Sequence, residues 1–111
     1  MITITDEMML DRISKTKYYT LVILRAGKNK SMEGADRIIW EHGRRNFVLR
    51  EEGKLSIVCP INDGSDCSGI GIFSTNLEET KKIMDEDEGV KQGIFIYEMH
   101  ECRSFPGDKL P

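Results

Sequence analysis

The feature that most constrains the fold of this chain is a long amphipathic segment, from about Met32 to Glu52, between two strand-like segments. Its apolar residues recur at offsets of three, four and seven, the spacing of one face of an α-helix. That face carries Ala35, Ile38, Ile39, His42 and Leu49. Gly53 follows the segment, and a glycine there supplies the left-handed residue that ends a helix. We therefore expect one long helix that packs against a sheet.

Four other segments have the composition of β-strands. β-branched, aromatic and alternating apolar residues mark residues 18–24, 54–61, 68–74 and 93–102. The turn-forming residues 62–66 join the second and third strands into a hairpin, and overlapping capping boxes at 75–79 begin a second helix that ends near Met84. The predicted order is β-α-β-β-α-β. This is a ferredoxin-like α+β fold, a four-stranded antiparallel sheet with two helices on one face.

The predicted sheet has apolar side chains on both faces. In the second strand Leu55, Ile57 and Cys59 alternate with Ser56 and Val58. The two helices cover only one face, and only 39% of the residues are hydrophobic. We therefore expect a second copy of the chain to cover the other face, in a homodimer whose interface exceeds about 1,000 Å².

The ends of the chain lie outside this pattern. Residues 1–17 form an N-terminal extension, in which Thr5 or Asp6 is a candidate cap for a short helix, and residues 18–102 form the domain. Residues 103–111 form an irregular tail.

Composition argues against several classes of partner. The net charge of −3 and the pI near 5.4 do not provide the positive field that nucleic acids or anionic membranes require. RNA-recognition domains of similar topology stack bases on aromatic residues, whereas Ile70 and Ile72 occupy those positions here. The chain has no apolar run near the ~20 residues of a membrane span, and its start lacks the features of a signal peptide. With three cysteines and no CxxC pair, we expect a cytoplasmic protein with reduced thiols.

No motif in the sequence indicates a metal or an organic cofactor. Cys59, Cys67, His100 and Cys102 have the chemistry of zinc ligands, but their spacing does not match a zinc site. The sequence also lacks a phosphate-binding loop, a dinucleotide fingerprint and a G-x-S-x-G nucleophile motif. We expect neither a metal nor a cofactor.

His42 is the most informative candidate for chemistry, because it interrupts the apolar face of the long helix. One interpretation is a core histidine whose ring nitrogens bond to a carbonyl group or a water molecule. The other is a functional imidazole, since histidine titrates close to neutrality. The acidic run 85–88 follows the second helix and has two interpretations as well. It is either a solvated helix end, or one of its carboxylates is held elsewhere, for example against an imidazole.

Several segments together resemble the YCII-related (YciI-like) family. In order and spacing, they are His42, residues 50–55, 59–64, 69–73, 77–79 and 87–93. The resemblance covers about residues 18–102 and implies a ferredoxin-like domain that dimerises into an α+β barrel.

The resemblance also implies an active site built from His42 and Asp87, with Pro60 and Asp63 as ligand-binding residues. The sequence departs from the family pattern at two positions. Glu88 replaces a proline after the aspartate, which makes the Asp87 turn less rigid. Cys59 replaces a glycine before Pro60, which narrows any pocket by one side chain.

The implied function is a small-molecule enzyme of lyase or isomerase type. A carboxylate bonded to one ring nitrogen of His42 fixes the tautomer and leaves the other nitrogen as general base or acid. One alternative is a non-catalytic metabolite-binding or regulatory dimer. A second is a structural dimer whose His42 belongs to the core.

Overall fold

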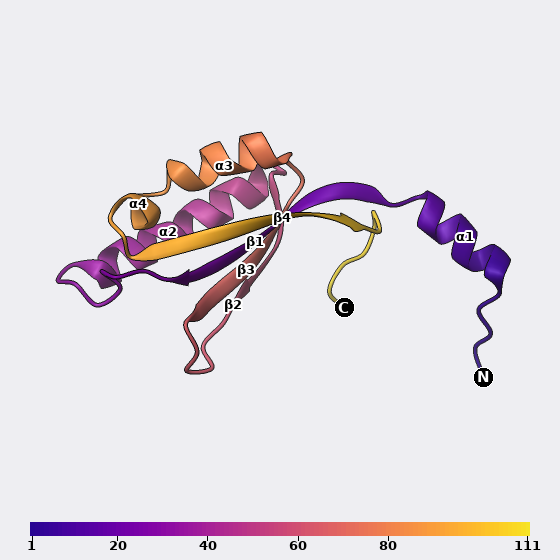
Figure 1. Cartoon of the computed structure of the whole chain (residues 1–111), viewed down its shortest axis with the longest axis horizontal. Coiled ribbons are helices and arrows are strands. Elements are labelled where there is room, and N and C mark those ends of the chain that lie inside the picture. Colours follow the sequence, from indigo (N-terminus) through magenta and orange to yellow (C-terminus); the bar gives the residue numbers. More distant parts are fainter.

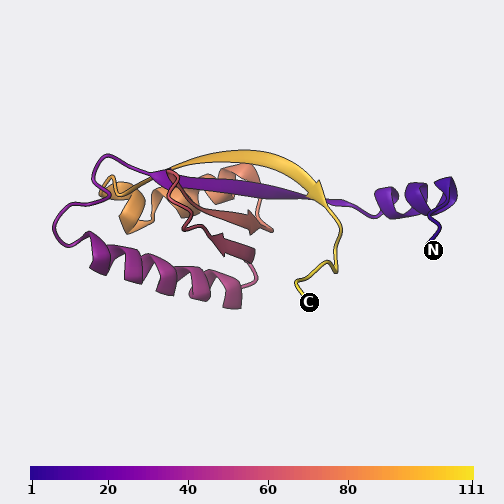
Figure 2. The same ribbon diagram turned by 90° about the horizontal axis from the view of Figure 1, so that it is seen from below.

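The protein forms a four-stranded antiparallel sheet with helices on one face. The computed structural model describes all residues 1–111. Its elements are α1 (Asp6–Ser14), β1 (Lys17–Ala26), α2 (Ala35–Glu51), β2 (Leu55–Pro60), β3 (Cys67–Phe73), α3 (Leu77–Asp85), α4 (Glu88–Lys91) and β4 (Phe95–Ser104). The strand order is β2-β3-β1-β4, and α2, α3 and α4 lie on the same side of the sheet (Figures 1 and 2). The predicted α+β class and antiparallel sheet are confirmed, and the topology is compatible with a ferredoxin-like fold.

The hydrophobic core lies between the sheet and the helices. In β1 the buried residues Thr20, Val22 and Leu24 alternate with partly exposed neighbours, so one face of the strand points to the helices. The buried apolar residues are Val22, Leu24, Ala35, Leu49, Leu55, Phe73, Ile83, Met84, Ile94 and Phe95.

A bulge in β2 changes which side chains face the helices. The register with β3 shifts between Leu55 and Ile57, so the strict alternation predicted for this strand is wrong. Beyond the bulge Val58 lies opposite the buried Gly71, on the helix side of the sheet, as Leu55 does before it. Ile57 and Cys59 therefore point to the open face.

The long helix begins three residues later than its periodicity predicts. Gly34 is its N-cap with φ of +83°, a left-handed conformation that cannot continue a helix. The end is as predicted, because Gly53 takes φ of +75° just beyond the helix. A short helix that was not predicted, α4, follows α3, and Asp87 is its N-cap.

The β1–β4 pair extends beyond the rest of the sheet. Lys17 pairs with Ser104, whereas the pairing of β1 with β3 starts only at Thr20. The predicted domain limits at 17/18 and 102/103 therefore fall inside this two-stranded ribbon.

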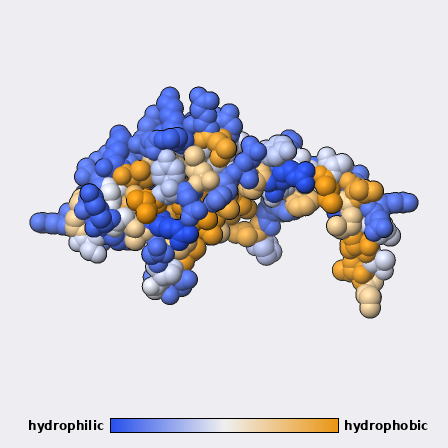
Figure 3. All heavy atoms as spheres, viewed as in Figure 1, coloured by the Kyte–Doolittle hydropathy of each residue, from blue (hydrophilic) through white to orange (hydrophobic).

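The N-terminal extension contains α1, which points away from the domain (Figures 1 and 2). Thr5 caps this helix by accepting a hydrogen bond from the Met8 amide, and none of its residues is buried. Exposed apolar side chains gather on this extension (Figure 3): Ile2, Ile4, Met9, Leu10 and Ile13. None of the helices has both the length and the apolar character that a membrane crossing requires.

Candidate functional site

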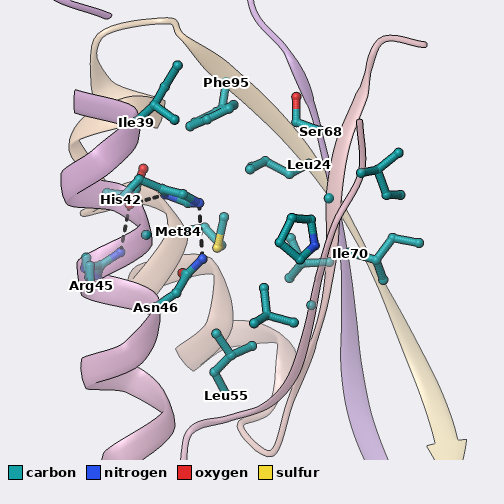
Figure 4. A pocket seen from close by; sticks show the side chains of 18 of the residues that line it. Leu24, Ile39, His42, Arg45, Asn46, Leu55, Ser68, Ile70, Met84 and Phe95 are labelled. Carbon is teal, nitrogen blue, oxygen red and sulfur yellow. Dashed lines mark hydrogen bonds and ion pairs between the residues drawn. The ribbon is translucent and has the colours of Figure 1, made fainter. Parts of the chain in front are cut away.

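A cavity of about 340 Å³ lies between α2 and the sheet (Figure 4). Much of its wall is apolar, formed by Val22, Leu24, Ile39, Leu49, Leu55, Val58, Met84 and Phe95. Three of its wall residues, Gly43, Gly69 and Gly71, have no side chain, and a Cβ on Gly43 would meet no atom within 4 Å. Close packing therefore does not explain why position 43 of α2 is a glycine. Gly43 thus leaves open space beside the helix, whereas Gly69 and Gly71 are closely packed, since a Cβ there would lie 3.1 Å from Cys59 O and 3.2 Å from Leu55 Cδ1 respectively.

His42 and Asp87 form a hydrogen-bonded pair at the wall of this cavity. His42 Nδ1 lies 2.9 Å from Asp87 Oδ1, although 45 residues separate them in the chain. The Asp87 side chain is 2% exposed and that of His42 is 14% exposed. His42 comes from the middle of α2, and Asp87 from the residue that caps α4. The structure thus brings together the two residues that the sequence selected.

Asp87 is held by donors on both carboxylate oxygens. Arg45 Nη1 lies 3.4 Å from Oδ1, and the Val90 amide donates to Oδ2 at 3.2 Å. Burial acts to raise the pKa of Asp87, but the hydrogen bond and charge of His42, the Val90 amide and the Arg45 charge outweigh it. The net effect lowers the pKa of Asp87, so this carboxyl group is ionised at neutral pH.

The ionised carboxylate determines the tautomer of His42. A carboxylate only accepts hydrogen bonds, so His42 Nδ1 carries the proton and donates it to Asp87. In the neutral ring Nε2 is then an acceptor. The amide nitrogen of Asn46 lies 3.4 Å from Nε2 and donates to it. Nε2 is therefore the basic atom that the site presents, partly engaged by one neutral side chain (Figure 4).

The acidic run 85–88 spans a junction between two helices. α3 ends at Asp85, and α4 begins at Glu88 with Asp87 as its cap. A carboxylate at a helix N-terminus is stabilised by the free amides and the dipole there. This explains why Asp87 is held inside while its neighbours in the run are exposed.

The structure places both residues that depart from the family pattern, Glu88 and Cys59. Glu88 occupies the first position of α4, where proline is favoured but where the amide needs no partner within the helix. The Asp87 side chain holds this turn without a proline, since it accepts a hydrogen bond from the Val90 amide. Cys59 lies on the open face and is not a wall residue, so it does not narrow the cavity.

The structure separates the two residues proposed to bind a ligand. Pro60 is part of the cavity wall. Asp63 is not, because its carboxylate turns back within the β2–β3 loop and accepts a hydrogen bond from the Ser65 amide at 3.0 Å. Hydrogen bonds from Ser65 lower the pKa of Asp63. Its neighbour Asn62 lines the cavity instead.

Several polar wall residues were not selected from the sequence. Arg45 and Asn46 lie three and four residues after His42, so helical spacing was a usable signal for both. Lys30 had no such signal, because it reaches the cavity from the loop after β1. His100, the second histidine, pairs with Glu98 at 2.9 Å and is not in the wall.

No three side chains of histidine, cysteine, aspartate or glutamate are grouped as a metal site would require. Comparison with known proteins adds no assignment, since neither a protein-family model nor a curated protein matches the chain.

Proposed function

We propose that this protein is a YciI-like small-molecule enzyme that performs lyase or isomerase chemistry by proton transfer, without a cofactor. The observation that carries the proposal is the His42–Asp87 pair, in which the ring nitrogen not bonded to Asp87 lies at the wall of a largely apolar cavity. The resemblance of residues 18–102 to the YCII-related family supports it. A buried aspartate that accepts a hydrogen bond from an imidazole is the arrangement in which a histidine serves as general base.

The chemical step follows from the tautomer. His42 Nε2 takes a proton from a carbon next to an electron-withdrawing group, and the electron pair of that C–H bond stays on the substrate. The ionised Asp87 stabilises the imidazolium that forms. In an isomerase the same nitrogen returns the proton to another atom. In a lyase the electron pair expels a leaving group, which takes the proton.

We further propose that the protein acts as a homodimer, in a dimeric α+β barrel, in the cytoplasm. The open face of the sheet has no cover from the helices, and its partly exposed apolar residues are Leu21, Ile23, Ile57, Ile70 and Ile72. Burying such a face against a second copy removes it from water. All three cysteines are free, which fits a reducing compartment.

A non-catalytic metabolite-binding or regulatory role is the second candidate. The observation that favours it is the hydrogen bond from Asn46 to His42 Nε2, which occupies the atom that catalysis requires. In that case the cavity binds its ligand without turnover.

Hydrogen–deuterium exchange separates these roles without knowledge of the natural substrate. Small carboxylic acids and lactones are incubated with protein in D₂O, and loss of C–H signals is followed by NMR. An enzyme of the proposed kind exchanges at least one compound, and His42→Gln abolishes the exchange. His100→Gln, the matched control, retains it. If thermal shifts show binding but no compound exchanges, the protein is a binding module.

A further inference from the structure

The cavity contains one positive charge that has no negative partner. Its charged wall residues are Lys30, Arg45 and Asp87, besides His42. Arg45 and Asp87 form an ion pair with each other, whereas Lys30 forms none. The Lys30 ammonium instead lies 3.3 Å from Ser68 Oγ and 4.8 Å from the centre of the Phe95 ring. Hydroxyl and ring hold the ammonium in place but leave its charge uncompensated.

The loop that carries Lys30 is fixed in position. Gly27 donates its amide to Ile94 O at 2.8 Å, and Asn29 donates its amide to Gly93 O at 2.9 Å. The Asn29 side chain donates to Gln92 O at 2.8 Å. These bonds join the loop after β1 to the segment between α4 and β4. Lys30 is therefore held relative to Asp87, which caps α4 in that same region.

The Lys30 ammonium and Leu55 lie at opposite ends of the cavity. Ser68 and Phe95 lie at one end and Leu55 at the other, with His42 between them (Figure 4). Phe95 connects the two functional groups, since its ring centre is 4.9 Å from that of His42 and 4.8 Å from Lys30 Nζ. Lys30 thus provides a cationic group at the Ser68–Phe95 end, and the apolar side chain of Leu55 lies at the other end.

We propose that the cavity binds a small carboxylic acid with an apolar body, and that Lys30 binds its carboxylate. The apolar body extends past His42 toward Leu55. Lys30 is then a specificity-determining residue. This inference rests on the proposed function for its site, but it concerns binding and is tested apart from turnover. The single carboxylate of the wall, Asp87, is bonded to His42, Arg45 and the Val90 amide and forms no ion pair with Lys30.

The test compares carboxylates with neutral amides of nearly the same size and shape. Benzoate and phenylacetate are compared with benzamide and phenylacetamide, by NMR titration of the full-length protein. We expect the carboxylates to bind at least tenfold more tightly than their amides. In Lys30→Met the carboxylates lose about tenfold in affinity, which corresponds to ~1.4 kcal/mol, while the amides are unchanged. Methionine keeps an apolar stem against Phe95, so the packing of the loop is retained.

Two controls complete the design. Lys28→Met removes an exposed charge two residues away that is not in the wall, and it behaves as the wild type. Lys30→Arg keeps the charge and restores part of the carboxylate affinity. Equal binding of acid and amide by the wild type overturns the proposal. So does an unchanged preference for carboxylates in Lys30→Met, and so does the absence of any carboxylate binding.

The result for carboxylate binding by Lys30 can be distinguished from the result for proton exchange by His42. Carboxylate binding that depends on Lys30, without any proton exchange, supports the binding site and contradicts the enzyme. Exchange that depends on His42, with no preference for acids over amides, supports the enzyme and overturns the role of Lys30.

Discussion

Gly27 lies so close to Gly93 that a Cβ on Gly27 would stand 2.2 Å from the Gly93 carbonyl oxygen. Both glycines belong to loops, one after β1 and one before β4. This close backbone contact brings together the two segments that supply Lys30 and Asp87 to the cavity. Because the obstructing atoms belong to the backbone, no side-chain rotation relieves such a clash.

Gly27→Ala is expected to lower the free energy of unfolding by about 1–3 kcal/mol, the usual cost of overpacking. Urea denaturation followed by circular dichroism measures it. Gly43→Ala serves as the control, since its Cβ enters open space. Unchanged stability of Gly27→Ala would contradict the close contact.

Gly43→Ala is itself expected to raise the free energy of unfolding by about 0.5–1 kcal/mol, because alanine is the better helix former. The added methyl group also enters the cavity wall, so benzoate binding weakens while stability rises. Gly34→Ala should have the opposite effect on stability, as Gly34 has φ of +83°. A Gly43→Ala protein less stable than the wild type would show that position 43 is packed.

Asp87→Asn is expected to destabilise the fold at neutral pH by about 1–3 kcal/mol, because Arg45 and His42 lose a charged partner. The folded-state pKa of Asp87 is below its ordinary value. Its contribution is therefore complete above the unfolded-state pKa near ~4 and is lost as pH falls through the folded-state pKa. Stability curves of wild type and variant should converge in acid. Asp66→Asn, which removes an exposed carboxylate, should show no such convergence.

The neutral His42 ring is expected to carry its proton on Nδ1. Two-bond ¹H–¹⁵N NMR spectra distinguish the two ring nitrogens, and His100→Gln assigns the signals. In Asp87→Asn the preference for this tautomer should weaken, because the amide can donate as well as accept. A dominant Nε2–H tautomer in the wild type would refute the role of Nε2 as a base.

Tyr97→Phe is expected to lower the free energy of unfolding by about 1 kcal/mol, since Tyr97 donates its hydroxyl hydrogen to Asp85 Oδ1 at 2.5 Å. Burial, followed by the hydrogen bond and charge of Asp85, raises the pKa of Tyr97 to about 12. The contribution is present below the unfolded-state pKa near ~10 and is lost as pH rises toward 12. Absorbance titration should show one tyrosine that ionises late and that is missing in Tyr97→Phe.

The local sequence pattern was sufficient to predict most of the helices and strands, and to predict that the His42 side chain faces the sheet. The 3.6-residue period of α2 put His42 on the face toward the sheet, and capping residues such as Asn76 marked where α3 begins. These properties depend on contacts within a few residues, which a sequence displays directly. The pairing of His42 with Asp87 came from the family resemblance and not from periodicity.

Tertiary structure decided the features that depend on distant partners. The bulge between Leu55 and Ile57 depends on the register with β3, so the alternation of β2 alone placed Val58 on the wrong face. The site of Lys30 depends on how its loop bonds to residues 92–94, more than 60 positions away in sequence. A sequence thus determines which groups are available and which local elements they occupy. Only packing between distant segments determines which of those groups meet, because the energies that select a register or a loop position arise between those segments.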